Sequence, residues 1–118
     1  MIYAGSSLKV NLLQDGIAEV VFDAQGSVNK FDKQTVAEMS AATEALKNNA
    51  QVKGVLVRSA KSTFIVGADI TEFTELFDMP EAEVLTWVAS TSQAFDHFED
   101  LPFPTIAAIN GFALAGGC

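Results

Sequence analysis

The sequence has little of what covalent cross-links, cation-rich binding surfaces and metal sites need. Among 118 residues there are one cysteine, one histidine and three prolines, and Lys and Arg together number 7 against 15 Asp and Glu. A single cysteine excludes an internal disulfide and is typical of a reducing, cytoplasmic setting. The net charge of −8 would repel a phosphate backbone, which argues against nucleic acid as a partner.

Long apolar runs are also absent. No stretch approaches the ~18 consecutive apolar residues of a membrane-spanning helix, so we expect no membrane span. The opening MIYAGSSLKV has no basic segment followed by an apolar one, which argues against a secretory signal. Repeats, low-complexity tracts and Pro/Ser-rich linkers are missing too. With 49% apolar residues, the chain has the composition and length of one small globular domain.

What is present is an alternation of strand-like and helix-like segments. The pair Asp15-Gly16 separates LKVNLLQ from IAEVVFD and predicts an antiparallel hairpin. An amphipathic helix is predicted from Asp32 to the stretch KNNA, with Glu38 on its polar side. The apolar stripe of that helix is Val36, Met39, Thr43 and Leu46. KGVLVRSA then predicts a strand buried on both faces, so the series indicates an α/β domain.

A second helix is predicted after Asp78-Met79-Pro80, because proline is tolerated at an early helical position. Its apolar stripe, which we expect to pack in the core, consists of Val84, Val88, Thr91, Phe95 and Phe98. The helix ends in a charged cluster, which is interpreted as a solvated face because no nucleophile accompanies the lone histidine. The cluster comprises Asp96, His97, Glu99 and Asp100. PTIAAIN then predicts another short buried strand.

Two loops of small residues each follow a strand and leave the backbone approachable: FIVGADI, residues 64–70, and NGFALAGG, residues 110–117. Asp69 and Glu72 are spaced as a capping pair for a short helix, which is a structural explanation for Asp69. Backbone N–H groups from two such loops could also form an oxyanion hole near helix N-termini. The spacing leaves both explanations open, because glycine-rich turns between strand and helix are common.

Taken in order, SVNKFD, KGVLVRS, FIVGADITEF and LPFPTIAAINGFALAGGC resemble the enoyl-CoA hydratase/isomerase, or crotonase, superfamily over almost the whole chain. FDAQGSVNKFD and FIVGADITEF are most similar to multifunctional β-oxidation enzymes of bacteria. The resemblance implies a crotonase-like strand-strand-helix spiral, incomplete here, with residues 1–118 as the amino-terminal part of the domain. It also implies a role in fatty acid β-oxidation, namely hydration of 2-trans-enoyl-CoA to 3-hydroxyacyl-CoA and isomerisation of 3-enoyl-CoA.

The same resemblance assigns the site. The matching oxyanion donors are the backbone N–H groups of Ala68 in VGAD and Gly116 in LAGGC. Substrate contacts would come from Ala68, Asp69, Ile70, Thr71 and Gly116. Lys61 could meet a CoA phosphate, or it could be an ordinary solvated loop lysine. The family has three glycines where this chain has Ala115-Gly116-Gly117, so the methyl group of Ala115 is a departure at the tightest turn.

The family's two acid/base glutamates would lie beyond Cys118, so we expect the chain to be a fragment that is inactive by itself. No metal and no cofactor are implied for these residues, and acyl-CoA would be the substrate. In a longer protein, NAD would serve a dehydrogenase part and a thiolase β subunit would be the partner. We also expect uncovered apolar strand faces at 53–58 and 105–109 to make the isolated chain self-associate.

Two alternatives stay open on the sequence. The chain could be a non-catalytic acyl-CoA contact surface or a folding unit, because the glutamates are missing. The fold could instead serve another superfamily reaction, such as hydrolysis, cleavage or dehalogenation of an acyl-CoA thioester. Residues that follow Cys118 in the family would distinguish these reactions.

Overall fold

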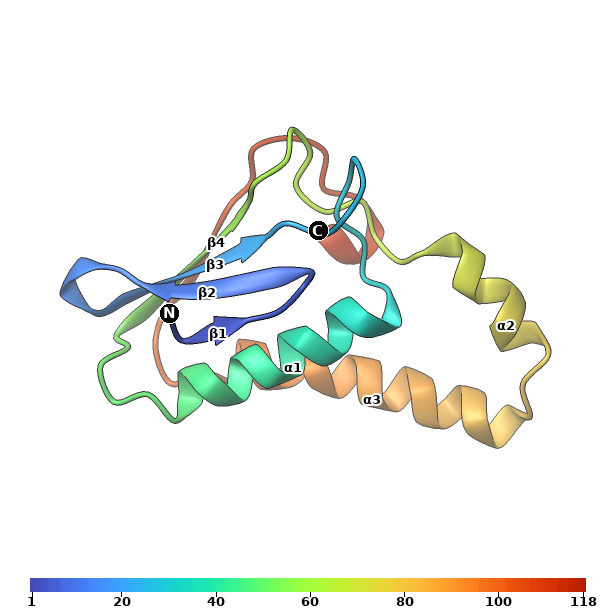
Figure 1. Cartoon of the computed structure of the whole chain (residues 1–118). Coiled ribbons are helices and arrows are strands. Elements are labelled where there is room, and N and C mark those ends of the chain that lie inside the picture. The colour runs from blue at the N-terminus through green and yellow to red at the C-terminus, as the bar shows by residue number, and fades with distance from the viewer.

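The computed structural model describes all residues from Met1 to Cys118 as one sheet with helices on one face. The strands, in the sheet order β1-β2-β3-β4-β5, are β1 (Tyr3–Ala4), β2 (Leu8–Leu12), β3 (Ile17–Phe22), β4 (Gly54–Ser59) and β5 (Thr105–Ala108). The helices are α1 (Lys33–Lys47), α2 (Phe73–Phe77) and α3 (Glu81–Glu99). Figure 1 shows α1 and α3 side by side beneath the sheet, with α2 projecting away from it.

The predicted hairpin is confirmed. β2 and β3 pair antiparallel, with Val10 opposite Val20. The turn between them bends at Asp15 and Gly16, whose φ angles are 62° and 79°. Aspartate tolerates this left-handed region and glycine adopts it freely, which explains the Asp-Gly pair. The short strand β1 was not predicted and adds to the open edge of β2.

β1 and β2 pair antiparallel, whereas β3–β4 and β4–β5 are parallel pairs, which confirms the α/β class. Val20 on β3 lies opposite Val57 on β4, and Val57 lies opposite Ala107 on β5. Parallel neighbours need long crossover connections, and α1 and the α2–α3 segment supply them. As a result, the loops that follow β3, β4 and β5 all emerge on the same side, at the carboxyl ends of these strands.

Helix α1 forms where the sequence predicts it. The carboxylate of Asp32 accepts a hydrogen bond from the Thr35 N–H at 2.8 Å and caps the first turn. Met39 and Leu46 are buried, and the helix ends at Lys47 with Asn48 as its C-cap. The core therefore lies between this helix and the inner face of β2, β3 and β4.

Glu38 corrects the predicted polar side of α1, since it is only 8% exposed. Its carboxylate accepts hydrogen bonds from the N–H groups of Ser7 and Leu8, at 2.9 and 3.3 Å, and from the Ser6 hydroxyl at 3.1 Å. The N–H groups of Ser7 and Leu8 would otherwise be buried without acceptors. Burial, and to a lesser degree the charge of Glu38, raise the pKa of Tyr3.

The prediction that β4 is buried on both faces is wrong. Val55 and Val57 point into the core, whereas Leu56 and Arg58 are only half-buried on the opposite face. There Arg58 Nε donates to a carboxylate oxygen of Glu19 on β3 at 2.9 Å. No helix of the chain covers this face, so the expected uncovered surface at 53–58 exists on one side only.

The predicted core role of α3 holds only toward the end of the helix, where Phe98 is partly buried against the core, and β5 is a strand but not a buried one. Of the α3 residues only Ala94 is fully buried, while Val88 and Phe95 are 47% and 37% exposed. All four residues of β5 are exposed, including Ile106 at 64%. The reason is that β5 is an edge strand and α3 packs mainly on α1. The expected uncovered surface at 105–109 is therefore confirmed.

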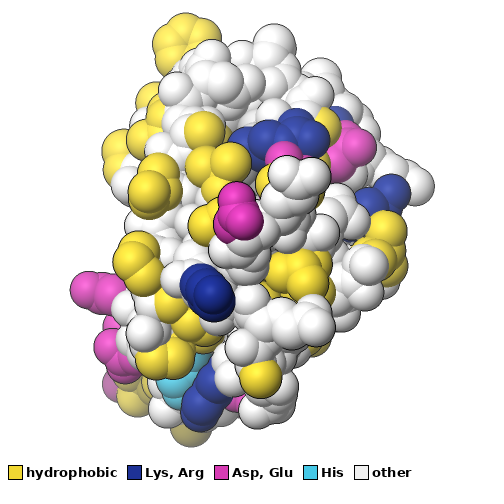
Figure 2. Space-filling view, turned by 90° about the vertical axis from the view of Figure 1, so that its left-hand side faces the viewer, with side chains coloured by type: hydrophobic (Ala, Val, Ile, Leu, Met, Phe, Trp, Pro, Cys, Tyr) yellow, Lys and Arg dark blue, Asp and Glu magenta, His cyan; other side chains and the backbone are white.

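Apolar side chains are also unevenly distributed over the outer surface. Figure 2 shows hydrophobic side chains gathered along one side of the visible face. The charged cluster at the end of α3 is exposed throughout, as expected for a solvated helix end. None of the helices combines the length and apolarity that crossing a membrane would require.

Candidate active site

The two small-residue loops come together at the carboxyl ends of β3, β4 and β5. Residues 64–67 lie between residues 29–31 on one side and residues 112–114 on the other. Gly67 and Ile65 accept hydrogen bonds from these neighbours, since the Phe31 N–H reaches the Gly67 oxygen at 2.8 Å and the Leu114 N–H reaches the Ile65 oxygen at 3.0 Å. Segments far apart in the sequence thus form one backbone layer.

Two glycines of these loops are explained by loop packing. Gly67 has a φ of 101°, and a Cβ there would lie 3.1 Å from the Leu114 oxygen. A Cβ at Gly117 would overlap the Ile65 carbonyl. Side chains at either position would push the loops apart.

Gly116 has no such structural reason to be glycine. Its φ lies outside the left-handed region, and a Cβ there would meet only the ring of Phe31 at 3.5 Å, an ordinary van der Waals distance. The residue is exposed. What the missing side chain leaves open is access to the backbone itself, which is what a backbone donor requires.

The Ala68 N–H has a fixed direction and no acceptor within the chain. It shares a peptide plane with the Gly67 carbonyl, which the Phe31 N–H holds in place. Because the peptide is trans, the N–H and C=O point in opposite directions. The Ala68 N–H is therefore aimed away from the Phe31 N–H.

The Gly116 N–H is held in the same way. The carbonyl of Ala115, on the other side of that peptide plane, accepts a hydrogen bond from the Cys118 N–H at 3.0 Å, and the Gly116 N–H has no acceptor in the chain. Ala115 itself has a φ of 49°, a left-handed conformation that costs a non-glycine residue about 1–2 kcal/mol. The extra methyl group thus strains the turn without preventing it.

Phe31 connects the two donors and a cavity. It forms a parallel bridge with Ala68, and its ring faces Gly116. The ring packs edge-on against Phe22 and Phe95, with centroids 5.9 and 5.0 Å apart. Beside it lies a cavity of about 210 Å³, 14 of whose 17 lining residues are hydrophobic, and Gly116 is part of the lining. An apolar space therefore adjoins one of the two backbone donors.

Asp69 caps the one-turn helix Ile70–Glu72, as the sequence predicts. Its carboxylate accepts hydrogen bonds from the Thr71 hydroxyl at 2.7 Å and the Thr71 N–H at 3.0 Å, and these bonds lower the pKa of Asp69. Glu72 does not complete the predicted capping pair, because its carboxylate accepts from the Lys33 N–H instead. Ile70 is 73% exposed and Thr71 is exposed, and neither forms a hydrogen bond to the second loop.

Lys61 is neither solvated nor free. Its side chain is 12% exposed, and its ammonium group donates to the Gly26 oxygen at 2.8 Å and lies 3.5 Å from a carboxylate oxygen of Asp23. The interpretation as a solvated loop lysine is wrong, and a ligand phosphate would have to compete with these partners. The sequence could not show this, since Gly26 is 35 positions away.

Sequence reasoning assigned no role to Asn29 and Phe31, which lie next to the predicted donors. Both belong to SVNKFD, one of the stretches that carry the family resemblance, but nothing in its local pattern indicates burial. Asn29 is 1% exposed and Phe31 is 8% exposed. Nowhere do three His, Cys, Asp or Glu side chains gather closely enough to hold a metal ion.

Comparisons with known proteins show the family of the chain. Residues 13–118 match the family model described as "Enoyl-CoA hydratase/isomerase". Proteins named fatty acid oxidation complex subunit alpha, from Colwellia psychrerythraea and Idiomarina loihiensis, are 58% and 55% identical over 100% of this chain. This confirms the predicted similarity to multifunctional β-oxidation enzymes. The chain spans 16% of the length of each of these relatives.

The fold has a close counterpart among solved structures. An enoyl-CoA hydratase from Shewanella pealeana superposes with a TM-score of 0.88 at 26% sequence identity. The match covers 94% of this chain and 42% of that structure. The predicted fold is confirmed, and the 118 residues correspond to less than half of that structure.

Proposed function

The chain belongs to the enoyl-CoA hydratase/isomerase family, and from this membership we propose that residues 1–118 are the amino-terminal part of a β-oxidation domain and supply its oxyanion hole. One observation carries the proposal. The N–H groups of Ala68 and Gly116 have no acceptor in the chain, while the carbonyl on the other side of each peptide plane is held by a hydrogen bond. Such donors are oriented before any ligand arrives.

These donors suit the chemistry of an unsaturated thioester. When the oxygen of water bonds to the β carbon of a 2-enoyl-CoA, water gives up one proton to a base, and the electrons of the double bond move toward the thioester oxygen and give an enolate-like charge. The charge returns to the α carbon, which takes up a proton. Preoriented N–H groups stabilise that charge without reorganising. The same hole would serve isomerisation of a 3-enoyl-CoA, which passes through a similar enolate.

The substrate would be an acyl-CoA, with its thioester at the two N–H groups and its acyl chain in the cavity beside Phe31. That cavity is lined mainly by hydrophobic side chains, which suits a hydrocarbon chain. Asp69, Ile70 and Thr71 form the exposed rim along which the pantetheine arm would run. Lys61 is not part of this proposal, because its ammonium group is already bound.

Proton transfer would require carboxylates that these residues do not provide at the hole. Asp69 is occupied with the Thr71 N–H and hydroxyl, and Glu72 with the Lys33 N–H. We propose that the acid/base glutamates come from the further residues that the longer relatives possess. The same longer protein would use NAD in a dehydrogenase part, pair with a thiolase subunit and work in the cytoplasm.

The test replaces one backbone N–H at a time by an ester oxygen, using the α-hydroxy analogue of Ala68 or Gly116. It uses the protein that carries these residues together with the rest of the relatives' length. Hydration of crotonyl-CoA, followed by loss of the conjugated thioester absorbance, should fall about 10²- to 10³-fold in kcat for either ester. Stability should hardly change, because neither N–H is bonded within the chain.

An ester at Leu114 is the matched control. Its N–H donates to the Ile65 oxygen at 3.0 Å, so the ester should lower the free energy of unfolding by about 1 kcal/mol. It should lower kcat far less than the esters at the two donor positions do. A folded protein that does not hydrate crotonyl-CoA would contradict the proposed reaction. Esters at both donor positions that leave kcat unchanged would contradict the proposed hole.

A further inference from the structure

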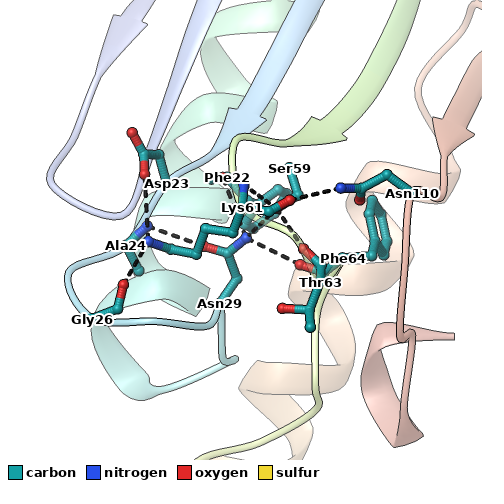
Figure 3. A network of polar contacts seen from close by, with 10 residues as sticks. All are labelled: Phe22, Asp23, Ala24, Gly26, Asn29, Ser59, Lys61, Thr63, Phe64 and Asn110. Atoms are coloured by element: carbon teal, nitrogen blue, oxygen red, sulfur yellow. Dashed lines mark hydrogen bonds and ion pairs between the residues drawn. The ribbon is translucent and has the colours of Figure 1, made fainter.

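We propose that Asn29 is a positioning residue that holds the two donor loops relative to each other, so that the N–H groups of Ala68 and Gly116 keep a fixed separation and direction. This inference rests on the proposed function, because it concerns how the oxyanion hole is kept in shape. Figure 3 shows the polar network on which it depends. The network joins the ends of β3 and β4 to both loops.

The side-chain amide of Asn29 is buried and fully engaged. Its oxygen accepts a hydrogen bond from the Ala24 N–H at 3.1 Å. Its nitrogen donates to the Ser59 hydroxyl at 2.8 Å and the Phe64 oxygen at 3.0 Å, with a longer contact of 3.3 Å to the Phe22 oxygen. Because one end faces a donor and the other faces only acceptors, the amide has a single favourable orientation.

Ser59 passes the constraint onward. Its hydroxyl donates to the Thr63 oxygen at 2.7 Å and accepts from Asn29 and from the Lys61 N–H, the latter at 2.9 Å. A hydroxyl has one hydrogen and two lone pairs, so its capacity is used completely. The turn at 60–63 is thereby held from both sides. It leads into the first donor loop, residues 64–70, whereas the second donor loop is residues 110–117.

The second loop is attached to the same network. The Asn110 side chain donates to the Lys61 oxygen at 2.6 Å, and Asn110 is the first residue of that loop. On the first loop, the backbone oxygen of Asn29 accepts from the Val66 N–H at 3.0 Å, two residues before Ala68. A continuous series of hydrogen bonds therefore runs from one donor loop through Asn29, Ser59 and Lys61 to the other.

Asn29 does not act on substrate directly. It is 1% exposed, and both ends of its amide are occupied within the chain. Its effect has to pass through the loops that it holds. Small misplacements of groups at a reacting centre can cost about 100-fold in rate, so a loosened network should be visible in catalysis.

The experiment compares Asn29→Asp with the unmodified sequence in the protein of the relatives' full length. Aspartate has the same shape and keeps the acceptor for Ala24, but it turns an oxygen toward the Ser59 hydroxyl and the Phe64 carbonyl. We expect kcat for crotonyl-CoA to fall about 10- to 100-fold with little change in KM. The carbonyl stretch of bound butyryl-CoA, lowered in frequency by the two N–H groups, should move back toward its free value.

A pair of variants at Ser59 tests the same inference if Asn29→Asp does not fold. Ser59→Ala removes the hydroxyl and should lower kcat and the carbonyl shift, while Ser59→Thr keeps the hydroxyl and should restore both. Asn49→Asp is the matched control, because its side chain bonds only to the nearby Gln51 N–H in an exposed loop. It should leave kcat and the carbonyl shift unchanged.

The outcomes separate the inference from the function on which it rests. If the unmodified protein does not shift the butyryl-CoA carbonyl, the proposed oxyanion hole fails, and the positioning role fails with it. If it does shift the carbonyl, and folded Asn29→Asp or Ser59→Ala keeps the full shift and full kcat, the positioning role is overturned while the proposed function stands.

Discussion

Strands β4 and β5 are neighbours in the same sheet, pair in the same parallel sense and have similar apolar sequences, yet their environments differ. Val55 and Val57 of β4 are 3% and 8% exposed, whereas Ile106 of β5 is 64% exposed. β4 has a strand on each side, while β5 lies at the edge. Burial is therefore decided by what packs against a strand and not by the sequence of the strand itself.

The two long helices repeat this difference. Helix α1 buries Leu46 completely, whereas Leu85 on α3 is 62% exposed. The molecule thus has a closed part, made of β1 to β4 with α1, and an open part, made of α3 and β5. The candidate site lies where they meet, because Phe31 precedes α1 and Gly116 follows β5.

The largest expected difference comes from the same substitution in each part. Leu46→Ala should lower the free energy of unfolding by about 2–5 kcal/mol, because it leaves a cavity in the core. Leu85→Ala should change it by less than about 0.5 kcal/mol, as is usual for an exposed site. Denaturant unfolding of both variants measures the effect. Equal losses would show that the open part is as well packed as the closed one.

The open part should also govern self-association. If its exposed apolar residues join copies of the chain, Ile106→Glu should weaken that association at least about tenfold, or about 1.4 kcal/mol. Leu13→Glu, in the exposed β2–β3 turn of the closed part, is the control and should leave association unchanged. Sedimentation or light scattering over a concentration series would decide. A monodisperse monomer before any substitution would contradict the expectation.

The helix caps give the next comparison. Asp32→Ala removes the cap of a helix of 15 residues that packs on the core, and should cost about 0.5–2 kcal/mol. Asp69→Ala removes the cap of a single exposed turn, and we expect a smaller loss of global stability. Thermal unfolding of the two variants is the measurement. A larger loss for Asp69→Ala would mean that the first donor loop supports the closed part.

A smaller effect is expected at the strained residue of the second loop. Ala115→Gly should raise the free energy of unfolding by about 0.5 kcal/mol, because relief of the left-handed strain exceeds the added freedom of glycine in the unfolded chain. Ala113→Gly, where φ is not positive, should lower it. If both variants lose stability, the turn at 115 is not strained in solution.

The smallest expected effect is a local dependence on pH at Asp69. Its folded pKa is lowered, so the stabilisation from its bonds to Thr71 is present above the unfolded value of about 3.9 and is lost as the pH falls through the folded value. The protection of the Thr71 amide, measured against its intrinsic exchange rate at each pH, should therefore fall in acid while the core stays protected. Asp69→Asn keeps an acceptor but does not titrate, and should abolish the dependence.

Features set by neighbouring residues could be predicted from the sequence. The hairpin follows from the backbone preferences of Asp15-Gly16, and the start of α1 follows from the cap at Asp32. The adjacency of the loops that contain Ala68 and Gly116 came from the family resemblance, and the parallel order of β3, β4 and β5 explains it. No local pattern alone would have brought these loops together.

Features set by distant residues could not be predicted. Glu38 looked solvent-facing on a helical wheel, but its acceptors serve the N–H of Ser7, 31 positions away. The exposure of β5 and α3 depends on which segments pack against them, and an apolar stripe is the same whether or not a partner is present. The network around Asn29 is partly of this kind, since Ser59 and Phe64 lie 30 and 35 positions from it.

The free N–H groups of Ala68 and Gly116 have a consequence for mutational scanning. The genetic code offers only proline to delete a main-chain donor, so every other point mutation at these positions leaves the group in place. An alanine scan would therefore record little at Ala68, which is already alanine, and would report only added bulk at Gly116. A site built from main chain can thus tolerate wide divergence of its side chains. Residue-by-residue screens will tend to rank the residues that position the donors above the donor residues themselves.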